Sequence, residues 1–146
     1  LSTSSFTALV LRISIMLVMF PHGCQSMLGA FGGGGFSNTM QYFTEVAGLP
    51  WLIGFLVIFI QFFGSLFILL GFLSRLNAFA MLVITVGMIF SGHVEHGFFM
   101  NWYGTQAGEG YEFHLLLFGL CLALLVSGGG KFSVDRLLHA KIIAKP

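Results

Sequence analysis

Four long stretches of apolar residues, separated by short polar segments, dominate the pattern of this chain. A helix needs about 20 predominantly apolar residues to cross the core of a bilayer. The stretches are continuous rather than alternating, and they are too long for strands, so they predict helices. We therefore expect an all-α integral membrane bundle of four transmembrane helices, at about residues 6–23, 49–73, 76–99 and 111–127.

The composition agrees with a membrane protein, because 57% of the residues are hydrophobic and only 8% are charged. A soluble domain carries about a quarter charged residues. We expect residues 1–146 to form a single transmembrane domain, with residues 128–146 as a tail on the inner surface. No small-residue cleavage site follows the first apolar run, so we expect no cleaved signal peptide. The net charge of +1 offers no basic field for nucleic acid, so the expected partner is the lipid bilayer.

The basic residues predict how the chain is oriented. Arg75 lies between the second and third runs, and the remaining basic residues of this side follow the fourth run: Lys131, Arg136, Lys141 and Lys145. With four crossings all of them fall on one side, which the positive-inside rule assigns to the cytoplasm. The segments 22–48 and 93–110 contain no Lys or Arg and would face outward. We expect a multi-pass protein of the cell inner (plasma) membrane with both termini on the cytoplasmic side.

Two polar residues, Arg12 and Gln61, fall inside the apolar runs. Each lies about ten residues from the outer boundary, which corresponds to a depth of about 15 Å. A charged side chain at that depth must face the interior of the bundle, reach a partner or extend to the surface. The two residues could therefore meet near the middle of the membrane, or Arg12 could extend to the inner surface instead.

Histidines gather at the predicted outer boundary. His93 and His96 are three residues apart, so on a helix they share one face. Glu112 and His114 are two residues apart and point in nearly opposite directions, so only one of them can meet that face. His22 lies at the outer end of the first predicted helix. Three helix ends thus bring titratable groups to one boundary.

Several kinds of chemistry fit this outer cluster. Histidines with a carboxylate can bind zinc or iron, and two histidines on different helices can ligate a haem. A histidine with a carboxylate can also hydrogen-bond a quinone and move its protons. The structural alternative is that these groups cap helices, as a carboxylate at Glu112 would in the first helical turn. We therefore expect a quinone or a haem as the candidate cofactor, and we predict no metal site.

At the inner side, Arg75 and Asp135 both lie just outside predicted helix ends. They are predicted to form a structural ion pair. An exposed pair of this kind contributes only about 0–1 kcal/mol to stability.

Five short motifs, which follow one another along nearly the whole chain, resemble those of the DoxX family of small membrane proteins. They are PHGCQ-x-x-L-G-x-F-G-G (21–33), G-x-x-x-x-x-x-G-F-L-S-R (64–75), H-x-x-x-G-F-F (93–99), G-Y-E (110–112) and G-G-G-K-F-S-V-D (128–135). The resemblance implies a four-helix inner-membrane protein. It also implies an association with redox chemistry, since the family is linked to terminal quinol oxidase and thiosulfate:quinone oxidoreductase.

The chain departs from the family at two positions. The family usually has a lysine at the position of Ser26 and a glutamate at the position of Gln61. One hypothesis is that the two form a functional charge couple in relatives, which this chain has lost. The alternative is that Gln61 keeps the hydrogen-bonding half of that role as a neutral partner of Arg12.

Three functions follow from these observations. The first is a small accessory subunit that stabilises a larger quinone-linked or respiratory-type membrane assembly by packing against its other subunits. The second is a stand-alone quinone-linked oxidoreductase that uses the outer histidines and glutamate. The third is a small-solute transporter that works as a homo-oligomer, supported by Arg12 and Gln61. Whether the chain is an enzyme stays open at this point.

Overall fold

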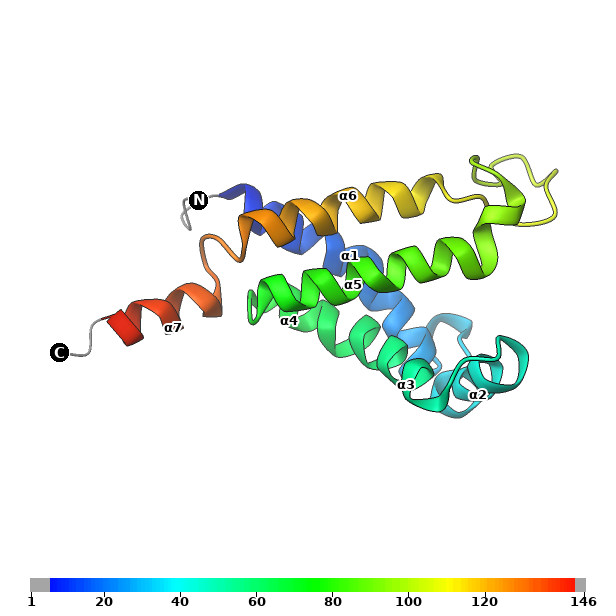
Figure 1. Cartoon of the computed structure of the whole chain (residues 1–146), viewed down its shortest axis with the longest axis horizontal. Helices are drawn as coiled ribbons and strands as arrows, with labels where there is room; N and C mark the ends of the chain where they lie inside the picture. Colours follow the sequence, from blue (N-terminus) through cyan, green and yellow to red (C-terminus); the bar gives the residue numbers. More distant parts are fainter. Residues whose placement is uncertain (1–5, 144–146) are drawn as a thin grey trace.

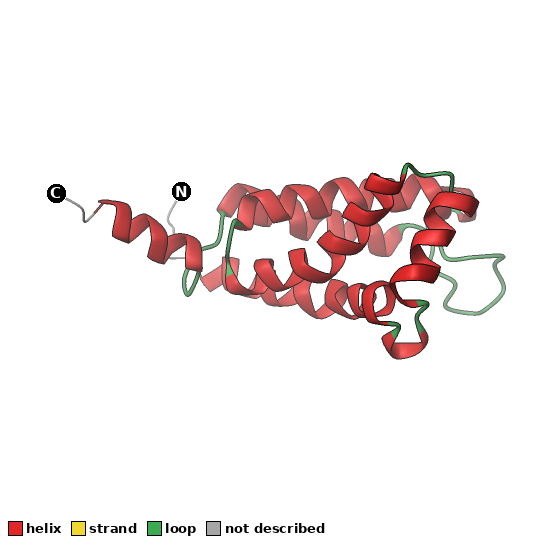
Figure 2. Cartoon of the chain, turned by 90° about the horizontal axis from the view of Figure 1, so that it is seen from below, coloured by secondary structure: helices red, strands yellow, loops and turns green. Residues whose placement is uncertain are grey.

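The computed structural model describes residues 6–143, which are helical and contain no strand. The main helices run along the long axis of the molecule (Figure 1), and the perpendicular view shows the same packing (Figure 2). In chain order they are α1 (Phe6–Leu28), α3 (Trp51–Phe59), α4 (Ser65–Leu70), α5 (Ser74–Met88) and α6 (Glu112–Ser127). A π-helical turn, η3 (Ile60–Gly64), joins α3 to α4. Lys145 lies outside the described residues.

Three helical segments are long and apolar enough to cross a membrane: Phe6–Leu28, Trp51–Leu70 and Ser74–His96. The helix α6 is also apolar, but it has 16 residues. At 1.5 Å per residue it is about 24 Å long, which is shorter than a hydrocarbon core of about 30 Å. The all-helical membrane architecture is therefore confirmed, while the fourth crossing and the cytoplasmic location of the termini stay predictions.

Helix α1 continues through Pro21 to Leu28 instead of ending near residue 23. A proline removes one backbone donor and bends a helix, but neighbouring helices can satisfy the freed carbonyl in a membrane bundle. The third predicted helix ends earlier as a regular helix. After α5 it first widens into the π-helical η4 (Ile89–His93) and then tightens into the 3₁₀-helical η5 (Val94–His96). The prediction of a regular helix to residue 99 is wrong.

The segment between the first two long helices is mostly helical, which the sequence did not indicate. It contains η1 (Ala30–Gly32), α2 (Gly35–Gln41) and the π-helical η2 (Tyr42–Val46). Figure 1 shows α2 and the loop before α6 at one end of the bundle, and α7 (Val134–Ile143) extending from the other end. The helix α7 falls within the predicted inner-surface tail.

The shared core draws on α1, α4, α5 and α6, with these buried residues: Ile15, Met19, Ile68, Ala78, Met81, Leu117, Cys121 and Leu124. The two ends of the bundle differ in chemistry. We call the end with α7 the basic end, for Arg75, Lys131, Arg136 and Lys141. We call the opposite end the histidine end, for His22, His93 and His114. Basic and titratable side chains are therefore separated to opposite ends of the bundle.

Candidate functional site

A pocket of about 410 Å³ opens at the histidine end, between α1, η3, the end of α5 and the start of α6. Its volume is in the range of pockets that hold small molecules. The lining combines a few polar groups with thioether and aromatic walls: Met19, His22, Gln61, Met88, His93, Met100, Glu109, Phe113 and His114. Three of the predicted outer histidines therefore meet here, together with Gln61.

His93 and His114 form the polar centre of the pocket. Their ring centroids are 4.1 Å apart and the rings are inclined by 41°. His93 Nδ1 lies 2.9 Å from the carbonyl oxygen of Glu109. A carbonyl can only accept, so Nδ1 carries the proton and Nε2 of the neutral ring is an acceptor. The geometry thus assigns the tautomer of His93.

His114 is only 5% exposed. Its Nδ1 atom is buried and has no hydrogen-bond partner among the described residues. A buried polar atom without a partner costs about 1–3 kcal/mol. A ligand that supplies a hydrogen-bonding atom at this point would recover that free energy.

Two of the polar lining residues are carried by π-helical turns. Gln61 lies in η3 and His93 ends η4. A π-turn widens a helix by one residue, is rare, and occurs frequently at functional sites. The apolar pattern of the sequence did not predict these turns, although they carry both side chains.

Gly23, in the PHGCQ motif, allows α1 to approach η3 closely. A Cβ atom at this position would lie 2.6 Å from the carbonyl oxygen of Gln61 and 2.6 Å from the Cα atom of Phe62. Only a glycine fits that contact, and the contact brings His22 and Gln61 to the same pocket.

The two positions at which the chain departs from the family motifs touch one another. Ser26 Oγ donates to Gln61 Oε1 at 3.2 Å, and it also lies 3.0 Å from the carbonyl oxygen of His22. A lysine at position 26 and a glutamate at position 61 would therefore also lie next to each other. The hydroxyl and the amide therefore form a neutral pair at the two positions where the resemblance leads us to expect a charged one.

Arg12 does not meet Gln61, and of the two alternatives for Arg12 the structure agrees with the extension toward the inner surface. The side chain is fully buried and extends toward the basic end. Nη1 donates to the carbonyl oxygen of Leu69 at 2.9 Å, and Nη2 donates to those of Lys131 and Phe132 at 2.7 and 3.2 Å. The last carbonyls of a helix lack partners within it, which is why the end of α4 attracts a cation. Arg12 and Gln61, the two residues that supported the transporter hypothesis, therefore have different partners and do not contact each other.

His96 lies outside the pocket. Its Nε2 atom is 3.6 Å from Glu95 Oε1, and its ring packs beside Gly108. The expectation that His93 and His96 share one helical face is wrong, because the chain is not a regular α-helix after Met88.

Glu112 also has a structural role outside the pocket. Its Oε1 atom accepts from the backbone N–H of Met100 at 3.0 Å and from Trp102 Nε1 at 2.8 Å. The carboxylate thereby folds the preceding loop onto the start of α6. Of Glu112 and His114, it is His114 whose ring lies against that of His93.

Arg75 and Asp135 form no ion pair in the described part of the chain. Asp135 accepts from the backbone N–H groups of Leu73 and Ser74 at 2.7 and 2.8 Å, while Arg75 Nη2 donates to the carbonyl oxygen of Val126 at 3.3 Å. The free N–H groups at the start of α5 attract the carboxylate more strongly than an exposed guanidinium does.

The geometry of the pocket favours an organic ring over a metal ion. Within residues 6–143, no group of three His, Cys, Asp or Glu side chains could hold a metal. An iron ligated by both His93 and His114 would separate their rings by two bonds of about 2 Å each, but the rings are already in contact. A bis-histidine haem therefore does not fit this arrangement of the two rings.

Several apolar helices around buried intramembrane polar groups define a multi-pass membrane protein. A family model described as DoxX matches residues 7–94, more than half of the sequence, and the chain belongs to that family. It is similar to the inner membrane protein YqjF of Escherichia coli K12, with 34% identity over 108 residues, 73% of this chain and 77% of the relative.

The inner membrane protein YphA of the same organism is 27% identical over 132 residues, which are 88% of this chain and 87% of that relative. No solved structure matches the chain. The relatives and the apolar helices together show a multi-pass protein of the inner membrane.

Proposed function

We propose that this chain is a small inner-membrane subunit that binds the ring of a quinone-type ligand at the histidine end and serves a larger redox assembly. The observation that carries the proposal is the buried, unpartnered Nδ1 atom of His114 in a pocket that it shares with His93. An apolar ring bearing oxygens is the kind of ligand that pairs such an atom within apolar walls.

The polar groups match both redox forms of a quinone. A quinone carbonyl accepts a hydrogen bond and a quinol hydroxyl donates one, and a neutral histidine can supply either half. With its Nδ1–H held by the carbonyl of Glu109, His93 offers Nε2 as an acceptor for a quinol proton. The thioethers of Met19 and Met88 and the ring of Phe113 provide walls for the ring faces.

The role within an assembly is supported by the resemblance of the chain to a family linked to quinone-dependent complexes. It is also supported by broad apolar faces, on which residues such as Leu17, Phe79 and Leu116 are exposed and available for packing against other helices. A stand-alone quinone-linked oxidoreductase is the second candidate, because it would use the same pocket.

A binding titration with paired histidine variants tests the site. The purified protein in lipid nanodiscs would be titrated with a short-chain benzoquinone. His93→Ala and His114→Ala should each weaken binding by about tenfold, as expected for losing one buried hydrogen bond. His96→Ala is the matched control and should leave affinity unchanged, because His96 lies outside the pocket. The site would be contradicted if all three variants changed the benzoquinone affinity equally, or if His114→Ala left it unchanged.

A second measurement separates the subunit from the enzyme. Gentle-detergent purification from native membranes, with the mass of the intact complex, should recover the chain in fixed ratio with a haem, flavin or copper protein. Quinone turnover by the purified chain alone, lost in His93→Ala, would instead establish the enzyme.

A further inference from the structure

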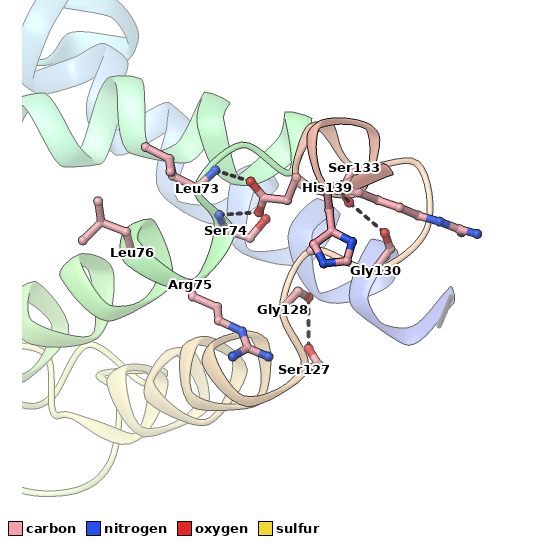
Figure 3. Close-up of a pocket in the computed structure, with 12 residues that line it drawn as sticks. Leu73, Ser74, Arg75, Leu76, Ser127, Gly128, Gly130, Ser133 and His139 are labelled. Atoms are coloured by element: carbon pink, nitrogen blue, oxygen red, sulfur yellow. Dashed lines mark hydrogen bonds between the residues drawn. The ribbon is translucent and has the colours of Figure 1, made fainter. Parts of the chain in front are cut away.

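A second pocket, of about 600 Å³, lies at the basic end and plays no part in the function proposed above. Figure 3 shows Arg75 on α5, Gly128 at the end of α6 and His139 on α7 around one space. Arg136 on α7 also lines it. Three elements that are distant in the sequence thus line one space, and two of them, α5 and α7, bring basic side chains to it.

The pocket is built by a specific fold of the chain. After α6 ends, the segment that leads to α7 returns to the turn between α4 and α5. There the backbone N–H of Asp135 donates to the carbonyl oxygen of Gly71 at 2.9 Å, and its carboxylate accepts from the backbone N–H groups of Leu73 and Ser74. These bonds hold the start of α7 against the start of α5, so the space between them has a defined shape.

The pocket is lined by two guanidinium groups and one carboxylate, so its formal charge is positive. Asp135, which is its acidic residue, is occupied by two backbone donors. Arg75 donates only a 3.3 Å hydrogen bond to a carbonyl oxygen, and in residues 6–143 neither Arg75 nor Arg136 lies within 4.0 Å of a carboxylate. Guanidinium groups in this state are suited to bind phosphate oxygens through charge-assisted hydrogen bonds.

A buried hydroxyl adds a further site for hydrogen bonding. Ser74 lines the pocket and is 0% exposed, and its Oγ atom has no hydrogen-bond partner among the described residues. A hydroxyl can donate to an anionic oxygen. The neighbouring Leu73 and Leu76 are apolar and exposed, at 48% and 61%, so an acyl chain could lie against the mouth of the pocket.

We propose that this pocket binds a phosphate group, carried by the headgroup of an anionic phospholipid. Arg75 and Arg136 supply the positive field, and Ser74 supplies a neutral donor. Basic pockets between membrane helices on the side of the anionic leaflet bind such headgroups. A soluble phosphate offers the same oxygens, so the test must distinguish the two sources.

The experiment measures lipid retained by the full chain. Native mass spectrometry from detergent would compare added phosphatidylglycerol with phosphatidylcholine. Phosphatidylglycerol should be retained preferentially, and Arg75→Gln should reduce its retention about tenfold, as for the loss of a hydrogen bond to a charged group. Lys141→Gln removes the same charge from α7 but outside the pocket, so it should retain the lipid. Equal retention of both lipids, or equal losses in both variants, would overturn the proposal of a lipid site.

A second arm identifies the source of the phosphate. Thermal unfolding would be followed in phosphatidylcholine nanodiscs with and without inorganic phosphate. The lipid proposal predicts no stabilisation by inorganic phosphate alone. Stabilisation that Arg75→Gln abolishes would overturn the lipid source and assign the pocket to a soluble phosphate. Arg75→Lys keeps the positive charge and should therefore retain the lipid. If Arg75→Gln fails to fold, Arg136→Gln removes the other positive charge of the pocket and takes its place in both experiments.

Discussion

Arg12 is a charge inside an apolar bundle, and its hydrogen-bond partners are backbone carbonyl oxygens. Its guanidinium reaches three carbonyl oxygens, one in α4 and two in the segment before α7. Gly71 makes room for it, since a Cβ there would overlap Nη1 of Arg12. The planar, forked guanidinium suits this arrangement, whereas an ammonium on a flexible stem cannot reproduce it. Arg12 therefore ties α1 to the basic end.

Replacing Arg12 with methionine should destabilise the protein by about 3 kcal/mol, because three carbonyl oxygens lose a charged donor in a buried place. Arg12→Lys should recover only part of that loss. Unfolding in detergent, followed by circular dichroism, measures both. Arg136→Met is the exposed control and should change stability by less than about 0.5 kcal/mol. If the two methionine variants behave alike, Arg12 does not hold the helices together.

Ser26 and Gln61 form a neutral pair at positions that carry opposite charges in the family pattern. Gln61→Glu alone should destabilise the protein, because it places a carboxylate at a position that is 7% exposed. Adding Ser26→Lys should restore stability, with a coupling energy of about 1–3 kcal/mol. A double-mutant cycle measures this term, and additive effects would show that the two side chains act independently. If the chain is the stand-alone oxidoreductase of the second candidate function, the double variant should also raise its quinone-reduction activity.

At the scale of elements, the contact between α1 and η3 sets the histidine-end pocket. Gly23→Ala should destabilise the protein by about 1–3 kcal/mol, since overpacking forces the backbone apart, and it should weaken benzoquinone binding. Gly119→Ala in α6 is the matched control, because a Cβ there meets no atom within 4 Å. Thermal unfolding and the titration above measure both variants. A Gly23→Ala protein as stable as the control would contradict the close contact.

The apolar runs predicted the elements but not their details. Continuous apolar stretches require backbone groups to be satisfied within the helix, so the long helices could be read from the sequence. The passage of α1 through Pro21 could not, because it depends on what packs against the freed carbonyl. The π-turns η3 and η4 were missed for the same reason, since an i→i+5 turn is set by packing rather than by local preference.

The candidate site was predictable where spacing on a regular helix decides direction. Glu112 and His114 point apart as a two-residue separation requires, whereas His93 and His96 separate because the helix is irregular there. The sequence analysis did not predict that residues without titratable groups, such as Met19 and Met88, line the pocket at the histidine end. Met19 and His22 are three residues apart on α1, and that spacing was the available signal.

For the whole molecule, the basic end should face the cytoplasm if the positive-inside rule holds. Thr105→Cys, in the exposed loop before α6, should react with a membrane-impermeant thiol reagent in intact cells. Lys141→Cys should react only after the membrane is opened. The native Cys24 and Cys121 are buried and give the background. The reverse pattern of labelling would invert the orientation and place the histidine-end pocket at the inner face.

The most direct test of the central claim is to map where a quinone binds. The intact protein in nanodiscs would be labelled with a photoreactive benzoquinone and digested for mass spectrometry. We predict labelling on pocket residues from separate helices, such as Met19, Met88 and Phe113, which excess unlabelled benzoquinone suppresses. Labelling confined to lipid-facing residues such as Leu17 and Leu116, and insensitive to competition, would contradict a quinone site at the histidine end.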